Sequence, residues 1–159
     1  MVVSHCLLNQ NAVVNGLERA RGAFPITKYI LDKGIGVLQL PCPELLALGS
    51  ERKPMTYEEY ANLPGFKKIC EDILKPIFLQ LEMYISNGYR YIGVIGINKS
   101  PSCSISSKMG VLMELYFKYC KENNFTQNYM EIPTWYDENN IGDLEKVFEN
   151  LQRDRKSVV

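Results

Sequence analysis

The sequence lacks an excess of charge of either sign, because 18 Lys and Arg residues balance 18 Asp and Glu residues over 159 positions. A neutral chain has no general field that attracts polyanions, so the composition argues against DNA, RNA or an anionic membrane as a partner. The sequence also lacks any apolar run near the roughly 20 residues that span a bilayer. Its first residues contain no basic segment followed by a long apolar one, so we expect no signal peptide and a cytoplasmic protein.

Histidine and tryptophan are scarce, with one residue each, whereas there are five cysteines. An odd number of cysteines cannot all pair in intramolecular disulfides. A chain of this length can also bury about two-thirds of its unfolded surface, so it does not need disulfides for stability. We therefore expect free thiols that are either buried or functional.

Apolar segments alternate with amphipathic ones along a single domain, which we place at residues 1–152, followed by a disordered tail at 153–159. Strands are predicted at Val2–Val3, Gly36–Leu40, Tyr89–Ile97 and Asn128–Ile132. Helices are predicted from Pro25 to Gly34 and over 65–87, 106–122 and 141–151, with irregular loops over 7–24 and 49–64. This βαβαβαβα order predicts a Rossmann-like three-layer α/β domain with a parallel sheet of about four strands.

Three of the five cysteines each follow a predicted strand. Cys6 comes after the first strand, Cys42 after the second and Cys103 after the third. Ligands of open α/β sheets bind outside the carboxyl ends of the strands, so these three loops should meet at one edge of the sheet. Cys70 and Cys120 instead lie on the apolar stripes of predicted helices, and we expect them in the core.

Three thiols at one cleft are compatible with several kinds of site. A disulfide would use two of them and leave the third. Zinc could take all three together with His5, but neighbouring side chains such as His5 and Cys6 point to opposite faces of an extended chain, and no close cysteine pair of the zinc-finger kind is present. A 4Fe–4S cluster held by three cysteines would leave one iron open as a Lewis acid. The spacing alone does not choose iron over zinc.

The residues next to these cysteines suggest how such a site could act. Glu44, two residues after Cys42, is the only carboxylate adjoining one of the three cysteines, which makes it a candidate general base. A carboxylate at the start of a helix is also stabilised by the helix dipole alone. Arg19 and Arg21 could offset the charge of an anionic cluster or bind a polar base, but we favour their interpretation as solvated loop charges.

Three short motifs, taken together, carry a family resemblance. They are His5-Cys6-Leu7-Leu8, then Pro41-Cys42-Pro43-Glu44 with Arg52-Lys53-Pro54 downstream, and Lys99-Ser100-Pro101-Ser102-Cys103. Over about residues 3–135 the chain resembles the thiouracil desulfurase (TudS) family, and within it the branch of TudS-related desulfidases. The resemblance implies a Rossmann-like domain in which Cys6, Cys42 and Cys103 hold an oxygen-sensitive 4Fe–4S cluster that aerobic preparation would lose.

The same resemblance implies roles for the polar residues. The open iron would take the sulfur of a thiolated nucleobase, and water would replace that sulfur without net redox change. Glu44 would be the catalytic acid/base, and Ser102, or less so Ser100, would orient the substrate or the water. Arg52 and Asn9 are the predicted substrate-binding residues. The chain departs from the better-described branch at Asn9-Gln10-Asn11 and at Ser104, which bears on the substrate rather than on the cluster ligands.

We therefore predict an enzyme, an iron–sulfur-dependent non-redox desulfidase that acts on a thiouracil-like nucleobase or a related small thiocarbonyl compound. The alternative is a non-catalytic sulfur carrier or a zinc-binding α/β module that uses the same three cysteines. We expect a small thio-substrate as the partner, and neither a nucleic acid nor a membrane. The sequence leaves open whether the chain forms a homodimer.

Overall fold

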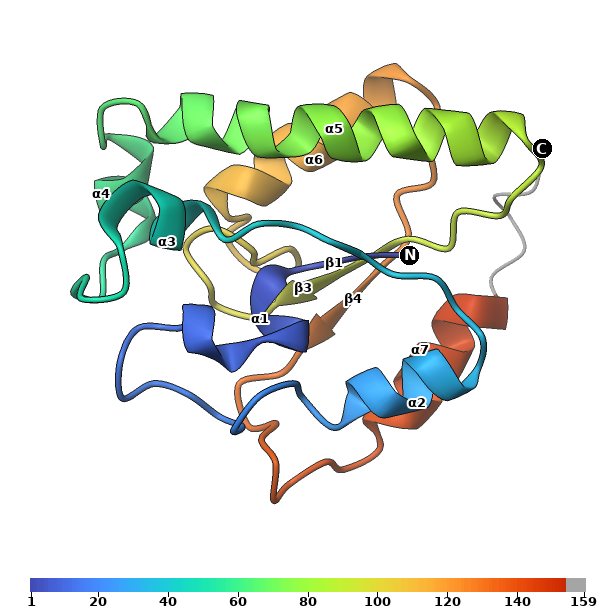
Figure 1. Cartoon of the computed structure of the whole chain (residues 1–159), viewed down its shortest axis with the longest axis horizontal. Helices are drawn as coiled ribbons and strands as arrows, with labels where there is room; N and C mark the ends of the chain where they lie inside the picture. Colours follow the sequence, from blue (N-terminus) through green and yellow to red (C-terminus); the bar gives the residue numbers. More distant parts are fainter. Residues whose placement is uncertain (154–159) are drawn as a thin grey trace.

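A four-stranded parallel sheet forms the centre of the molecule (Figure 1). The computed structural model describes residues 1–153, so the predicted tail lies outside the described residues apart from Arg153, which ends the last helix. The strands run in the order β2-β1-β3-β4, with β1 at Val2–Val3, β2 at Leu38–Gln39, β3 at Val94–Ile97 and β4 at Tyr129–Ile132. All neighbouring pairs are parallel, which confirms the predicted Rossmann-like α/β class.

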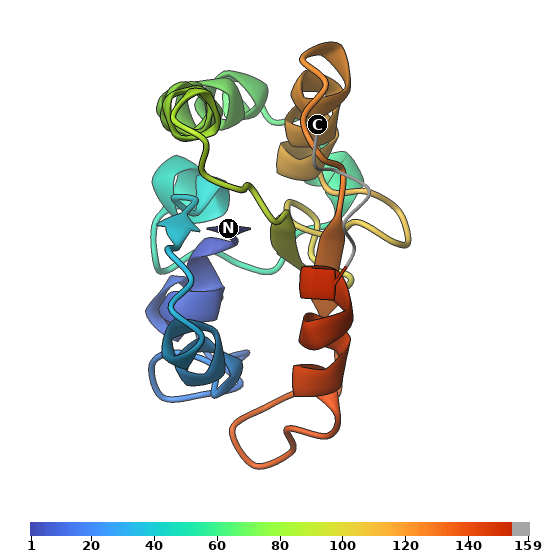
Figure 2. The ribbon, with the colours of Figure 1, turned by 90° about the vertical axis from the view of Figure 1, so that its right-hand side faces the viewer.

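Helices cover both faces of this sheet. Helices α5 (Phe66–Ser86) and α6 (Val111–Glu122) pack on each other over one face, and α2 (Ile26–Asp32) and α7 (Leu144–Arg153) lie on the other (Figures 1 and 2). Shorter helices gather near the carboxyl end of the sheet, namely α1 (His5–Leu8), the 3-10 helix η1 (Gln10–Ala12), α3 (Pro43–Leu48) and α4 (Tyr57–Ala61). Within residues 1–153 no helix has the length and apolarity to cross a membrane.

The long helix α5 shows how the apolar pattern positions these layers. Its buried residues recur every three or four positions and form one stripe: Phe66, Cys70, Ile73, Leu74, Ile77, Phe78 and Leu81. Cys70 is fully buried in this stripe, and Cys120 is fully buried on α6. The prediction that these two cysteines belong to the core is confirmed.

Two segments predicted as loops contain short helices. Helix α1 and η1 lie at the start of the first, and α4 lies within the second. Helix α4 begins with a capping box, in which the Thr56 hydroxyl accepts the Glu59 N–H at 3.2 Å and the Glu59 carboxylate accepts the Thr56 N–H at 2.7 Å. That motif is visible in the sequence, so this helix could have been predicted from it.

Strand β1 has the predicted bounds, whereas the other three strands and helix α6 are shorter than predicted. Strand β1 has two residues, and its register pairs Val2 with Leu38 and Val3 with Gln39, so β2 can be no longer. Helix α6 begins at Val111 rather than at 106. As a result residues 98–110 form one long loop after β3, and this loop contributes to the site described next.

Candidate functional site

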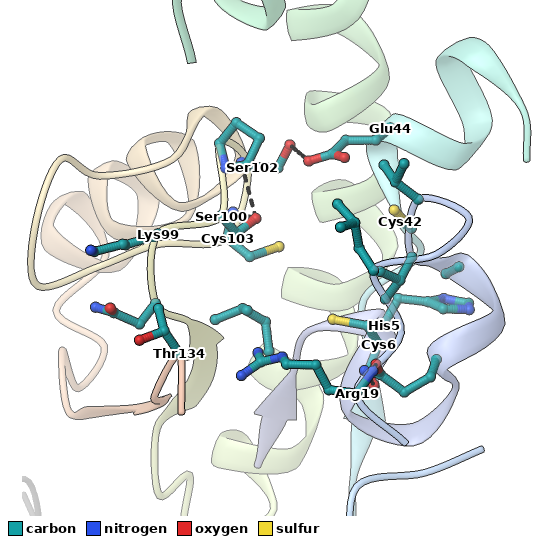
Figure 3. Close-up of a pocket in the computed structure, with 18 of the residues that line it drawn as sticks. His5, Cys6, Arg19, Cys42, Glu44, Lys99, Ser100, Ser102, Cys103 and Thr134 are labelled. Atoms are coloured by element: carbon teal, nitrogen blue, oxygen red, sulfur yellow. Dashed lines mark hydrogen bonds between the residues drawn. The ribbon is translucent and has the colours of Figure 1, made fainter. Parts of the chain in front are cut away.

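A cavity of about 300 Å³ opens at the carboxyl ends of the strands (Figure 3). The sheet order places β2 on one side of β1 and β3 on the other, so the segments that leave β1 and β3 diverge at this edge. Such a switch point is where open α/β sheets bind ligands. The cavity is lined by residues that follow all four strands, within segments 5–19, 42–52, 97–103 and at Thr134.

The three cysteines that follow strands all line this cavity. Cys6 lies in α1 directly after β1, Cys42 is the N-cap of α3 after β2, and Cys103 lies in loop 98–110. Figure 3 shows the sulfur atoms of Cys6 and Cys103 pointing toward one another across the cavity. All three are free thiols. The tertiary structure thus brings together the three cysteines that the sequence placed at strand ends.

Burial controls the ionisation of these thiols. It raises the pKa of Cys6 to about 12, with the negative charge of Cys42 adding to the effect and the guanidinium of Arg19 opposing it. Burial also raises the pKa of Cys42, and it raises the pKa of Cys103 well above the usual range, where Cys6 adds to the effect. The raised pKa values favour the protonated thiols at neutral pH, and a cation bound to the sulfur atoms would favour the thiolates instead.

His5 also lines the cavity, contrary to the expectation from an extended chain. The chain is helical from His5 to Leu8, so successive side chains are about 100° apart rather than on opposite faces. Burial lowers the pKa of His5, which favours the neutral imidazole. No group of three His, Cys, Asp or Glu side chains within residues 1–153 is arranged to hold a single metal ion.

Glu44 is held in the cavity wall by two neighbours. Its Oε1 accepts a hydrogen bond from the Ser102 hydroxyl at 2.7 Å, and its Oε2 lies 3.6 Å from Nε of Arg52. The Arg52 side chain is only 2% exposed, and it also donates to the carbonyl oxygens of Gly49 at 3.1 Å and Ala12 at 2.6 Å. Arg52 is thus placed to orient Glu44 and the loop before α2. Its guanidinium N–H groups face oxygen atoms of the protein itself.

Ser100 shapes the loop that carries Cys103. Its hydroxyl oxygen accepts the N–H groups of Ser102 at 3.3 Å and Cys103 at 3.0 Å. On the far side of the loop, the Glu131 carboxylate accepts the N–H groups of Ile105 and Ser106. The structure therefore ties Ser100 to the loop backbone and directs Ser102 at Glu44.

Asn9 is the one predicted site residue that does not line the cavity. Its side chain accepts the Asn11 N–H at 3.0 Å and caps η1. The next residue, Gln10, lines the cavity instead and is buried. Its Nε2 donates to the Cys6 carbonyl at 2.7 Å, and its Oε1 accepts the Arg19 N–H at 2.9 Å. The sequence carries no periodic signal here that would select Gln10 over Asn9.

Arg19 lines the cavity as well, so its interpretation as a solvated loop charge is wrong. Its Nη1 donates to the carbonyl oxygens of Pro133 at 2.6 Å and Tyr136 at 2.9 Å. Arg21, two residues later, is exposed and outside this cavity. The contacts of Arg19 join residues more than 110 positions apart, and no local pattern could have predicted them.

Fold and site together define a Rossmann-like α/β protein with a cysteine-lined cavity at its switch point. No protein-family model matches the chain, and no solved structure matches it. The chain is 43% identical over 133 residues to the uncharacterized protein MJ0003 of Methanocaldococcus jannaschii, covering 83% of this chain and 84% of that protein. This chain therefore belongs to the family of MJ0003.

Proposed function

We propose that this protein is an iron–sulfur-dependent, non-redox desulfidase that removes sulfur from a thiouracil-like nucleobase or a related small thiocarbonyl compound. The observation that carries the proposal is the meeting of three thiols and one carboxylate at a single cavity: Cys6, Cys42, Cys103 and Glu44. The likeness of the cysteine motifs to those of TudS-related desulfidases supports the same function.

The donor set suits a cluster better than a single ion. A single zinc ion needs donors that converge on one point at about 2.3 Å from sulfur, and the described part of the chain has no such group of three. A four-iron cluster takes each thiolate on a different iron, so the thiols can approach from separate walls. When bound, such a cluster supplies an iron without a protein ligand, which accepts the soft sulfur of a thiocarbonyl.

The chain's own residues supply the acid–base chemistry. Glu44, oriented by Arg52 and Ser102, accepts a proton from water as the water oxygen bonds to the thiocarbonyl carbon. The carbon–sulfur bond then breaks, and both protons of the water leave with the sulfur as hydrogen sulfide. The carbon gains oxygen and loses sulfur, so no electrons are gained or lost overall.

Anaerobic reconstitution with iron and sulfide tests this proposal. We expect a brown protein with about four irons per chain that releases sulfide from 4-thiouracil. Cys6→Ala, Cys42→Ala and Cys103→Ala should each lose the chromophore and the activity, because each removes one ligand.

The matched control is Cys70→Ala, which removes a buried thiol from α5 outside the cavity lining. It should retain its iron and lose only packing stability, on the order of 1 kcal/mol or more. A colourless protein with stoichiometric zinc would contradict the proposal in favour of a zinc module. A brown protein that binds sulfide but never turns over would favour a sulfur carrier.

A further inference from the structure

The guanidinium group of Arg19 bridges two segments that contribute to the cavity lining. Its Nη1 edge donates to the carbonyl oxygens of Pro133 and Tyr136, in the segment that follows β4. Figure 3 shows the side chain extending from the wall that carries Cys6 toward Thr134. One edge of the guanidinium is thus occupied by the protein.

Other contacts fix the plane and the position of this group. Its Cζ lies 5.1 Å from the centroid of the Phe24 ring, which is itself buried against Tyr136. The backbone of Arg19 is held at both ends, since its N–H donates to Gln10 and its carbonyl accepts the Glu138 N–H at 2.9 Å. A side chain fixed in this way loses little conformational entropy when it binds a ligand.

The other edge of the guanidinium is formed by Nε and Nη2. Nε and Nη2 of Arg19 make no hydrogen bond or ion pair within residues 1–153, although Arg19 lines the cavity. Arg52, the other arginine in the cavity lining, already faces Glu44, Gly49 and Ala12. Two parallel N–H donors on a planar, charged group match a carbonyl oxygen or an anionic ring nitrogen in the same plane.

We propose that Arg19 is the specificity-determining residue of this cavity, and that its free edge binds an acceptor on the substrate ring next to the reacting thiocarbonyl. This inference rests on the proposed function. It narrows the substrate class to planar thio-heterocycles that also carry a carbonyl or deprotonated nitrogen, rather than thiocarbonyl compounds without such an acceptor.

Steady-state kinetics of the reconstituted protein with two substrates tests the assignment. The substrate 4-thiouracil carries a ring carbonyl, and pyridine-4-thione does not. Arg19→Met should raise KM for 4-thiouracil about tenfold, as expected for loss of a charged hydrogen bond, with kcat within about twofold. The KM for pyridine-4-thione should stay unchanged, because that ring offers no acceptor to Arg19.

Two further variants separate recognition from folding. Arg19→Lys keeps a positive donor for the Pro133 and Tyr136 carbonyls but lacks the planar fork, so it should unfold near the wild-type temperature and still show the raised KM for 4-thiouracil. Arg21→Met removes an exposed charge from the same loop and should change neither KM. An equal rise in KM for both substrates, or no rise, would overturn the assignment.

Binding of uracil, measured by titration calorimetry, gives a readout that needs no turnover. Uracil has the carbonyl edge of 4-thiouracil and no sulfur. We expect Arg19→Met to weaken its binding about tenfold and Arg21→Met to leave it unchanged. If the wild type binds uracil through Arg19 but never desulfurates, the proposed function fails and the role of Arg19 stands. If the wild type desulfurates 4-thiouracil but Arg19→Met binds uracil as tightly as the wild type does, the proposed function stands and the role of Arg19 fails.

Discussion

Glu44 is a carboxylate that the fold holds in an unusual electrostatic setting. Its partner Arg52 is almost entirely buried, and the two groups face each other beside the cavity that the cysteines line. A buried charge of this kind costs several kcal/mol unless it is paired. The pair therefore serves two purposes, since Glu44 neutralises Arg52 and Arg52 orients the carboxylate.

Replacement of Glu44 by glutamine separates these two purposes. Glu44→Gln should keep its iron, because the three cysteines remain, but lose at least about 100-fold in desulfuration rate per iron, because an amide cannot take a proton from water. It should also lower the free energy of unfolding by about 3 kcal/mol, because the Arg52 charge is left unpaired. Sulfide release normalised to iron, together with chemical denaturation, measures both effects.

The control for this substitution is Glu58→Gln, on an exposed carboxylate of α4 that does not line the cavity. It should match the wild type in sulfide release. Full activity per iron in Glu44→Gln would remove Glu44 from the mechanism.

At the scale of elements, loop 98–110 decides where Cys103 lies. The loop is folded tightly against its flanks, because glycines permit close backbone approaches on both sides. A Cβ on Gly110 would lie 2.2 Å from the Ser102 carbonyl carbon, and one on Gly96 would lie 2.5 Å from the Cys103 carbonyl oxygen. Both contacts are with backbone atoms, which cannot relieve the overlap by a rotamer change as a side chain can.

Gly110→Ala should therefore displace the loop that carries Ser102 and Cys103. We expect it to destabilise the protein by about 1–3 kcal/mol and to reduce iron incorporation on reconstitution. Gly22→Ala is the matched control, since nothing lies within 4 Å of the added Cβ. If Gly110→Ala took up iron like the wild type, the position of Cys103 would not depend on this close approach.

At the scale of the whole molecule, the cavity joins parts of the chain that are far apart in sequence. Its three thiols come from segments after β1, β2 and β3, and Arg19 ties the first of these to the segment after β4. A cluster bound to all three thiols would link these segments in the folded state only. Ligands of the folded state stabilise it by mass action.

The reconstituted protein should accordingly unfold at a higher temperature than the metal-free protein under anaerobic conditions. We expect a rise of several degrees, since about 1 kcal/mol shifts the unfolding temperature by roughly 2–4 °C in a chain of this size. Cys103→Ala should unfold at the same temperature before and after reconstitution. Equal unfolding temperatures for the loaded and metal-free wild type would argue against a cluster that bridges the three segments.

Prediction from sequence was most successful where the signal is local. The stripe on α5 could be located from its helical periodicity, because burial of one face imposes that spacing, and the strand segments could be located from short apolar runs. Helix α4 was missed although its capping box is legible in the sequence. Helix α1 was missed because four residues are too few to show a helical period.

By itself, the sequence determined the parallel α/β class and the division of the cysteines into three at strand ends and two in the core. Both follow from hydrophobic pattern and chain order, which are properties of neighbouring residues. Only the tertiary structure decided that Gln10 rather than Asn9 lines the cavity and that Arg52 and Ser102 hold Glu44. It also decided that, among residues 1–153, only Nη1 of the Arg19 guanidinium makes hydrogen bonds. These features depend on contacts between loops that are far apart in sequence, such as Arg19 with Pro133. The pattern of neighbouring residues therefore cannot predict them.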